Sequence, residues 1–248
     1  MKKFLKYTLG IILLLILLLV LYLRLAVHES YPDIIEGKNA EAKATQMLEA
    51  VNKEAWDTLN YISWSFRGEH HYIWDRINND AIVKWGDTEV HLDPDEVTGS
   101  VIKNGKTLDK TEGAKDLQTA WSYWCNDMFW LSAPFKLKDP GVELKVAKDA
   151  DGKEGLLVQY ASGGVTPGDS YLWYTDESGM PTGYKMWVKI IPVGGVYTSW
   201  EDWQKLEGGS KIATNHQGNI SALSIPITNV NAGDSWQDLG YDSSPIKL

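Results

Sequence analysis

The side chains that could perform chemistry in this chain are a few histidines and acidic residues on expected strands. His70 and His71 are adjacent, so on a strand they would point to opposite faces and could not both bind one metal ion. His91 and Asp93 lie on a neighbouring expected strand and could join one of them in a zinc site. Polar positions on strands are the simpler interpretation, so the pattern predicts no zinc.

A second group of possible metal ligands lies at Asp149 and Asp151, which Gly152 and Glu154 follow. The spacing resembles part of a calcium loop, but a complete loop needs further acidic positions and a glutamate near its end. Lys153 also interrupts the pattern. We therefore expect a hairpin turn here, and the sequence predicts no bound metal ion and no other cofactor.

Motifs for catalysis are absent from the sequence. It contains no nucleophile elbow, no phosphate-binding glycine loop and no zinc-protease helix motif. An enzyme assembled from distant residues, such as a hydrolase that uses His71, Asp75 or Asp127, is the alternative to a binding function. The single cysteine, Cys125, excludes an intramolecular disulfide and a lipoprotein signal, and is expected to be a small buried hydrophobic residue.

Aromatic residues with a polar atom are unusually frequent, since the chain has 12 Trp and 12 Tyr but only 4 Phe. Such side chains bury a large area and still need a hydrogen-bond partner, so they suit the wall of a cleft or a membrane interface. A solid core is the competing interpretation. If the space is a cavity, its predicted ligand contacts are five strand residues and three helix residues: Ile62, Trp64, Phe66, Trp74 and Trp85, and Trp121, Trp124 and Met128.

Two helices are predicted from apolar residues at steps of three and four. The first covers residues 38 to about 53. The second covers about 114–131, where Trp121, Trp124 and Met128 share one face, and Pro134 follows its end. Such an apolar face must pack on another element.

Strands are predicted on both sides of the second helix from the alternation of apolar and polar residues. Asn104-Gly105 is a strong hairpin turn. About ten short strands at regular spacing predict a large curved antiparallel sheet or an incomplete barrel covered by helices. The segments expected as strands are 61–66, 72–75, 81–85, 90–92, 101–102, 107–108, 144–146, 156–160, 170–174, 184–190, 196–203, 212–214, 220–223 and 225–227.

The N-terminus carries the signal for cellular location. Lys2, Lys3 and Lys6 precede an apolar run from Leu9 to Leu23, and about 20 apolar residues in a helix can cross a bilayer. Basic residues before the run favour a cytoplasmic N-terminus. We therefore expect residues 1–27 to be a signal or an uncleaved single-pass anchor in the inner membrane. Residues 28–37 would be a short spacer, residues 38–236 a periplasmic or extracellular domain, and residues 237–248 a loose tail.

Net charge excludes one class of partner. The chain has 24 basic and 33 acidic residues, for a net charge of −9. Four of the basic residues (Lys2, Lys3, Lys6 and Arg24) lie in the N-terminal segment, so the rest of the chain is still more acidic. An acidic domain repels the phosphate backbone, so nucleic acid is not an expected partner.

The order of the expected elements resembles the LolA/LolB-like lipoprotein-carrier superfamily. Segment 176–186, DESGMPTGYKM, is similar to the turn that such proteins place before a strand under the lid. Segments 71–76 and 124–131 resemble uncharacterised exported proteins from Bacteroidota. The resemblance covers about residues 38–232 and implies an incomplete barrel whose concave apolar face is covered by helices. An anchored form departs from a soluble shuttling carrier.

These observations predict a membrane-anchored domain that binds a lipid, an acyl chain or a lipidated partner without catalysis. The alternatives are a hydrolase on the same scaffold and a structural envelope protein with no ligand. The sequence does not define the oligomeric state.

Overall fold

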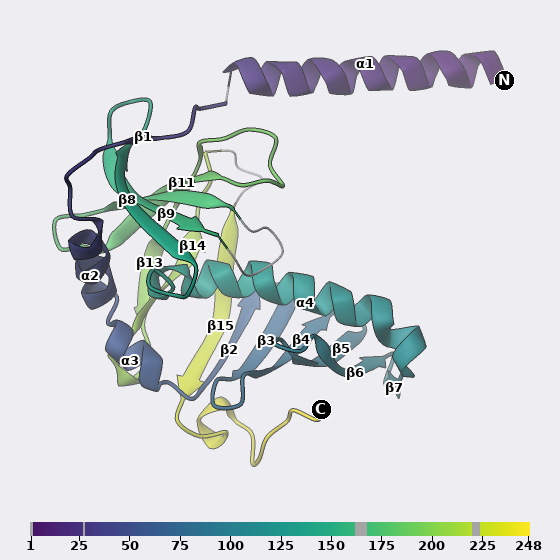
Figure 1. Cartoon of the computed structure of the whole chain (residues 1–248). Coiled ribbons are helices and arrows are strands. Elements are labelled where there is room, and N and C mark those ends of the chain that lie inside the picture. Colours follow the sequence, from purple (N-terminus) through teal and green to yellow (C-terminus); the bar gives the residue numbers. More distant parts are fainter. Residues whose placement is uncertain (1, 27, 162–167, 220–223) are drawn as a thin grey trace.

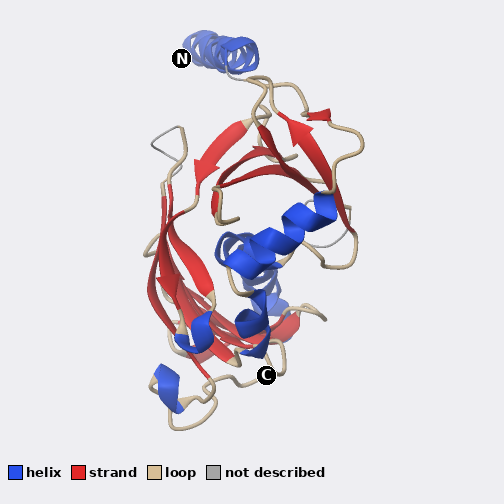
Figure 2. Ribbon diagram, turned by 90° about the vertical axis from the view of Figure 1, so that its left-hand side faces the viewer, coloured by secondary structure: helices blue, strands red, loops and turns tan. Residues whose placement is uncertain are grey.

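The structure is a computed structural model that describes residues 2–26, 28–161, 168–219 and 224–248. Its strands form two antiparallel sheets, one of six strands and one of nine, and Figures 1 and 2 show both sheets curving around helices. The sheets are not closed into a barrel. A mainly β fold with covering helices is therefore confirmed.

The nine-stranded sheet has the order β13-β14-β15-β2-β3-β4-β5-β6-β7. Strands β2 to β7 form the meander that the alternating residues predicted, and the Asn104-Gly105 turn joins β6 to β7 as expected. Its strands are β2 (Tyr61–Phe66), β3 (His70–Asp75), β4 (Asp80–Trp85), β5 (Thr88–Asp93), β6 (Thr98–Lys103), β7 (Lys106–Thr107), β13 (Glu201–Lys205), β14 (Lys211–His216) and β15 (Ile225–Gly233).

The six-stranded sheet has the order β1-β8-β9-β10-β11-β12. The turn at Asp149 joins β8 to β9, as the sequence predicted. Its strands are β1 (Asp33–Ile34), β8 (Val142–Lys148), β9 (Glu154–Tyr160), β10 (Ser170–Thr175), β11 (Pro181–Trp187) and β12 (Val196–Ser199).

The chain passes from one sheet to the other at Trp200. The expected strand over 196–203 is divided there into β12 and β13, and a single bridge between Thr198 and Gly218 links the regions. The expected strand over 184–190 was too long, because β11 ends at Trp187 and a loop follows. The expected strand over 220–223 lies outside the described residues.

Helices cover the concave side of both sheets (Figure 2). The predicted first helix is two helices, α2 (Ala40–Ala50) and α3 (Lys53–Thr58), because Asn52 adopts a left-handed conformation and caps α3 with its side chain. Trp56 lies in α3. The predicted second helix is α4 (Lys110–Ser132), and a short 3-10 turn, η1 (Ala133–Phe135), follows it at Pro134.

Two further 3-10 turns lie near the C-terminus, η2 (Glu207–Gly209) and η4 (Gln237–Leu239). Residues at the C-terminus, which were expected to form a loose tail, contact the nine-stranded sheet. The Lys247 amide donates to Nδ1 of His91 at 2.8 Å, and the Ser100 hydroxyl donates to the Lys247 carbonyl at 2.9 Å. The tail therefore reaches the side of β5 and β6.

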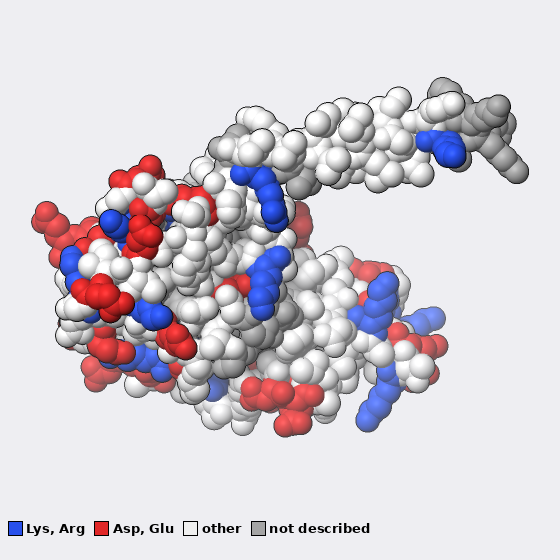
Figure 3. Space-filling model, turned by 45° about the horizontal axis from the view of Figure 1, so that its top comes forward, with Lys and Arg blue, Asp and Glu red and all other residues white. Residues whose placement is uncertain are grey.

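The N-terminal helix α1 (Lys2–Ala26) extends away from the body of the protein (Figure 1). Its large apolar side chains are exposed where described, and Figure 3 shows it as a rod with few charged groups beside a body rich in them. A search of the described residues finds no helix with the length and apolar character that a membrane span requires.

The expected spacer after α1 is attached to the six-stranded sheet. The Glu29 carboxylate pairs with Lys185 at 2.8 Å, and the Gly194 amide donates to Nδ1 of His28 at 2.9 Å. Burial opposes the charge of Lys185, but its bonds to Asp149 and Glu29 raise its pKa above the ordinary value. Residues 28–37 therefore belong structurally to the body.

Among the described residues, three apolar clusters fill the interior, and the smallest consists of Ala147, Leu157, Leu172 and Tyr174. The two larger clusters concern the candidate sites. We call the first the α4 cluster; its largest members are Trp56, Ile62, Trp64, Phe66, Tyr72, Trp124, Leu131 and Phe135. We call the second the α2 cluster; its largest members are Met47, Leu156, Trp173, Tyr184, Met186 and Trp200. Trp130 and Trp203 pack against both clusters.

Candidate functional site

The eight predicted ligand contacts lie together between α4 and the nine-stranded sheet. Trp124 of α4 contacts three rings of the sheet, with centroid distances of 5.8 Å to Trp64, 6.1 Å to Tyr72 and 5.2 Å to Trp74. Trp64 is also stacked on Tyr72 at 4.7 Å. These rings contact one another directly and pack as a core.

The predicted contacts differ in burial. Ile62, Trp64, Phe66 and Trp124 are buried, whereas the other four are only partly buried at the margin of the α4 cluster: Trp74, Trp85, Trp121 and Met128. All eight residues thus belong to the α4 cluster or pack against it. Their role as ligand contacts stays a prediction.

A buried carboxylate fixes α4 on the sheet. Asp127 is 1% exposed, and its Oδ2 accepts from the Tyr72 hydroxyl at 2.6 Å and lies 2.7 Å from Nδ1 of His70. Its Oδ1 accepts from Asn126 at 2.7 Å. Burial, and then the adjacent Asp127, raise the pKa of Tyr72 well above its ordinary value. The polar groups under α4 thus supply one another with partners.

The α2 cluster has a different character. Trp173 lies 4.8 Å from Tyr184 and 4.9 Å from Trp200, and Trp200 lies 4.3 Å from His216. Sequence reasoning did not identify this group as a site. Five polar side-chain atoms in and around it are buried without a hydrogen-bond partner: Tyr160 Oη, Trp173 Nε1, Tyr184 Oη, Trp200 Nε1 and His216 Nε2.

Burial shifts the pKa values of Tyr184 and His216 in this region. The Trp200 indole is near enough to the Tyr184 hydroxyl to favour its ionised form, but burial dominates and raises the pKa of Tyr184 well above normal. Neither atom has a partner of good hydrogen-bond geometry. Burial lowers the pKa of His216 to about 4, so this side chain is neutral near pH 7.

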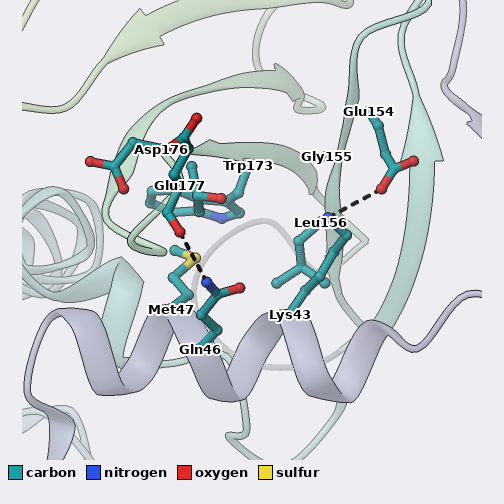
Figure 4. A pocket seen from close by; sticks show the side chains of 10 residues that line it. Lys43, Gln46, Met47, Glu154, Gly155, Leu156, Trp173, Asp176 and Glu177 are labelled. Atoms are coloured by element: carbon teal, nitrogen blue, oxygen red, sulfur yellow. Dashed lines mark hydrogen bonds and ion pairs between the residues drawn. The ribbon is translucent and has the colours of Figure 1, made fainter.

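A cavity of about 350 Å³ opens onto the α2 cluster, between α2 and the ends of β9 and β10. Met47, Leu156 and Trp173 form its apolar part, and Figure 4 shows the Trp173 indole across the space from α2. Ligand cavities in proteins are about 300–1,000 Å³, so this one is at the small end of that range.

Charged and polar groups form the rim of this cavity. Lys43 of α2 pairs with Glu154 at 3.1 Å, and Lys38 also bonds to Glu154, which holds the pKa of that carboxyl below its ordinary value. Gln46 donates to the Glu177 carbonyl at 3.4 Å. The cavity therefore has an apolar floor and a polar entrance, an arrangement that suits an amphipathic ligand.

The residues considered for zinc are separated. His70 faces Asp127, whereas His71 lies on the opposite face, where its Nδ1 is 2.8 Å from the Ser65 hydroxyl. His91 bonds to Glu89 and to the tail. Asp93 accepts from the amides of its own turn. Within the described part of the chain, no three potential ligand side chains gather around one point.

The turn considered for calcium is stabilised by Asp149 itself. Its Oδ1 accepts from the amides of Asp151 and Lys153, and its Oδ2 accepts from the Tyr174 hydroxyl at 2.6 Å and pairs with Lys185 at 2.9 Å. Burial favours the neutral carboxyl, but the bonds from Lys185 and Tyr174 lower its pKa. The hairpin interpretation is confirmed, and this carboxylate already has several protein partners.

The residues proposed for a hydrolase do not converge. His71 lies on the outer face of the sheet, Asp127 is under α4, and Asp75 accepts from the amides of Ile77 and Asn78 in a turn. Burial raises the pKa of Cys125 to about 11, so its thiol is protonated at neutral pH and is a poor nucleophile.

The fold has distant likenesses among solved structures. No family model and no curated protein matches the chain. Its structure is similar to that of a LolA superfamily protein from Nitrosomonas europaea, with a TM-score of 0.34 and 9% sequence identity, over 77% of this chain and 94% of that chain. This is the superfamily that the order of elements resembles, and the likeness concerns the fold and carries no argument about function.

Proposed function

We propose that this protein is a non-catalytic binding domain for an amphipathic ligand, such as a fatty acyl chain or a lipidated partner. The observation that carries the proposal is the cavity over the α2 cluster, whose apolar floor includes Trp173, a residue with a buried indole N–H that lacks a partner. A buried donor without a partner costs about 1–3 kcal/mol. A ligand acceptor that reached such a donor would remove that cost.

Trp173 is the residue best placed for this role. It is 1% exposed, lines the cavity, and has an unpaired indole N–H. Its ring would contact an acyl chain together with Met47 and Leu156, while Lys43 at the rim would attract a carboxylate head group. A cavity of about 350 Å³ accommodates part of a long chain, so the remainder would extend past α2.

The sequence-based site under α4 is the alternative location for the ligand. Trp121 and Trp124 would contact the ligand there. Because Trp124 already packs on three rings, binding there would require α4 to move away from the sheet and to break the bonds of Asp127. The cavity beside α2 requires no such movement, and we therefore favour it.

A location at the inner membrane, with the body in the periplasm or outside the cell, also remains a proposal. The basic residues Lys2, Lys3 and Lys6 and the apolar run after them support it. Protease added to cells with a permeabilised outer envelope should digest the body. Digestion only after lysis would contradict this topology.

Binding can be tested with a fluorescent fatty acid and the full-length protein, with displacement by unlabelled palmitate. We expect saturable binding that Trp173→Phe, which lacks the indole N–H, weakens. Trp124→Phe is the matched control, because it changes the same residue type in the α4 cluster. Weaker binding by Trp124→Phe alone would place the ligand under α4. The absence of saturable binding by the parent protein would contradict the proposed function.

A further inference from the structure

A second cavity, of about 340 Å³, lies on the outer face of the nine-stranded sheet, opposite the α4 cluster. Residues of β2, β3, β4 and β15 line it, and Leu239 and Tyr241 of the C-terminal segment form a further wall. Its polar lining consists of Ser63, Ser65, His71, Lys84, Asn229 and Asn231.

An irregularity in β15 places one of these polar groups. The register between β15 and β2 shifts between Thr228 and Asn231, and Asn229 has a φ of 53°. Asparagine tolerates this left-handed conformation better than most residues. The bulge directs the Asn229 amide to the Ser65 hydroxyl, to which it donates at 3.1 Å. Bulges of this kind often redirect a side chain at a functional site.

The Ser65 hydroxyl connects this amide to His71. Its oxygen lies 2.8 Å from Nδ1 of His71. The Ser65 oxygen accepts from Asn229 and keeps a second lone pair and its own hydrogen, so either Ser65 or His71 can be the donor in this pair. When the hydroxyl donates to Nδ1, the other ring nitrogen, Nε2, is a donor. The exposed His71 side chain can therefore offer an N–H group at the cavity.

The charge of the lining is unusual for this protein. The chain has 33 acidic residues, yet no Asp or Glu lines this cavity, whereas three line the cavity beside α2. Lys84 supplies a positive charge and pairs at 2.9 Å with Glu89, which is not part of the lining. An ammonium group, two amides and an imidazole N–H favour an anion with several acceptor oxygens.

We propose that this cavity binds a small organic molecule that carries a carboxylate or phosphate group. Lys84 and the side chains of Asn229, Asn231 and His71 would bind the oxyanion. Ile73, Ile82 and Leu239 would contact the apolar part of the molecule. Because Tyr241 belongs to the wall, bound ligand would also hold the C-terminal segment against the sheet.

Calorimetry on the full-length protein with benzoate and phenyl phosphate as probes tests this inference, and benzyl alcohol is the uncharged control. We expect one or both anions to bind and benzyl alcohol not to bind. Lys84→Gln should weaken anion binding about tenfold, because it removes the ammonium charge from the lining. Asn229→Gly should also weaken it, because glycine keeps the backbone conformation and removes the amide.

Lys106→Gln is the matched control, because Lys106 is exposed on β7 and far from the lining in the order of strands. Its affinity for the probes should equal that of the parent. The proposal is wrong if neither anion binds at concentrations up to about 10 mM, if benzyl alcohol binds as well as the anions, or if Lys106→Gln weakens binding as much as Lys84→Gln does. Preference for one probe identifies the oxyanion.

Discussion

The α4 cluster and the α2 cluster both contain buried tyrosine and tryptophan, but they treat the polar atoms of these residues differently. Under α4, the Tyr72 hydroxyl donates to Asp127, which also contacts His70, and the Trp74 indole donates to Asn79 at 3.1 Å. In the α2 cluster, Tyr184 and several neighbours have no partner. Two atoms beside the α4 cluster also lack a partner. They are Trp64 Nε1 and Nε of Arg76, whose guanidinium lies over the Trp56 and Trp74 rings.

This difference bears on the proposed binding site. Buried polar groups in proteins are nearly always paired, so a group of unpaired ones requires an explanation. The paired groups of the α4 cluster hold a helix on a sheet. Among the unpaired atoms of the α2 cluster, Trp173 Nε1 belongs to a residue that lines the cavity, and proteins accept such local costs mainly where they function. Aromatic content alone did not distinguish the two regions.

The largest expected effect tests whether the α4 cluster is a scaffold. Trp124→Ala should lower the free energy of unfolding by about 3–5 kcal/mol, because it removes a buried indole that packs on three rings. Urea denaturation measures the change. Trp121→Ala, at a partly buried position on the same helix, should cost less. A loss below about 1 kcal/mol for Trp124→Ala would mean that the region is already open.

The second expected effect is the pH dependence of stability that comes from His216, beside the α2 cluster. Burial lowers the pKa of His216 to about 4, whereas in the unfolded chain it is about 6.5. Between these pH values the unfolded state binds more protons, so stability falls as pH decreases, by at most about 3 kcal/mol. His216→Gln should reduce this slope in denaturation experiments between pH 7 and pH 4. An unchanged slope would contradict the burial of a neutral imidazole.

The smallest effect compares two fully buried tyrosines directly. Tyr72→Phe removes one of the hydrogen-bond donors to the buried Asp127 carboxylate and should cost about 1.5–3 kcal/mol. Tyr184→Phe removes a hydroxyl without a partner, so the unfolding free energy should stay within about 0.5 kcal/mol of the parent or increase. Thermal or urea denaturation of both variants measures the difference. Equal losses would show that the two clusters satisfy their polar groups equally well.

The sequence was informative where a residue's role depends on its close neighbours. Alternation predicted β2 to β6, and the spacing of Trp121 and Trp124 predicted α4 and the surface that it buries. The sequence could not show that these aromatic residues would pack as a core, because that depends on the distance between α4 and the sheet. It also gave Asp127 no partner, since His70 and Tyr72 lie more than fifty residues away in the chain.

The α2 cluster was missed for a related reason. Tyr184 and Met186 alternate as expected, but alternation does not say which face meets Trp173, and the strand break at Trp200 has no glycine or proline to mark it. The order of the C-terminal tail was also not predicted. Single contacts hold it, such as that of Lys247 with His91, and single contacts leave no periodic pattern in the sequence. The sequence likewise gave no indication of the second cavity, which Ser65 and His71 help to line, because the histidines and acidic residues form no recognisable motif.

The attachment of residues 28 and 29 has a mechanical consequence. Helix α1 ends at Ala26, and the ring of His28 already accepts from the Gly194 amide. A pull on α1 would therefore load Glu29 and Lys185 at the six-stranded sheet first, while the α4 cluster would bear the force only after that ion pair had broken.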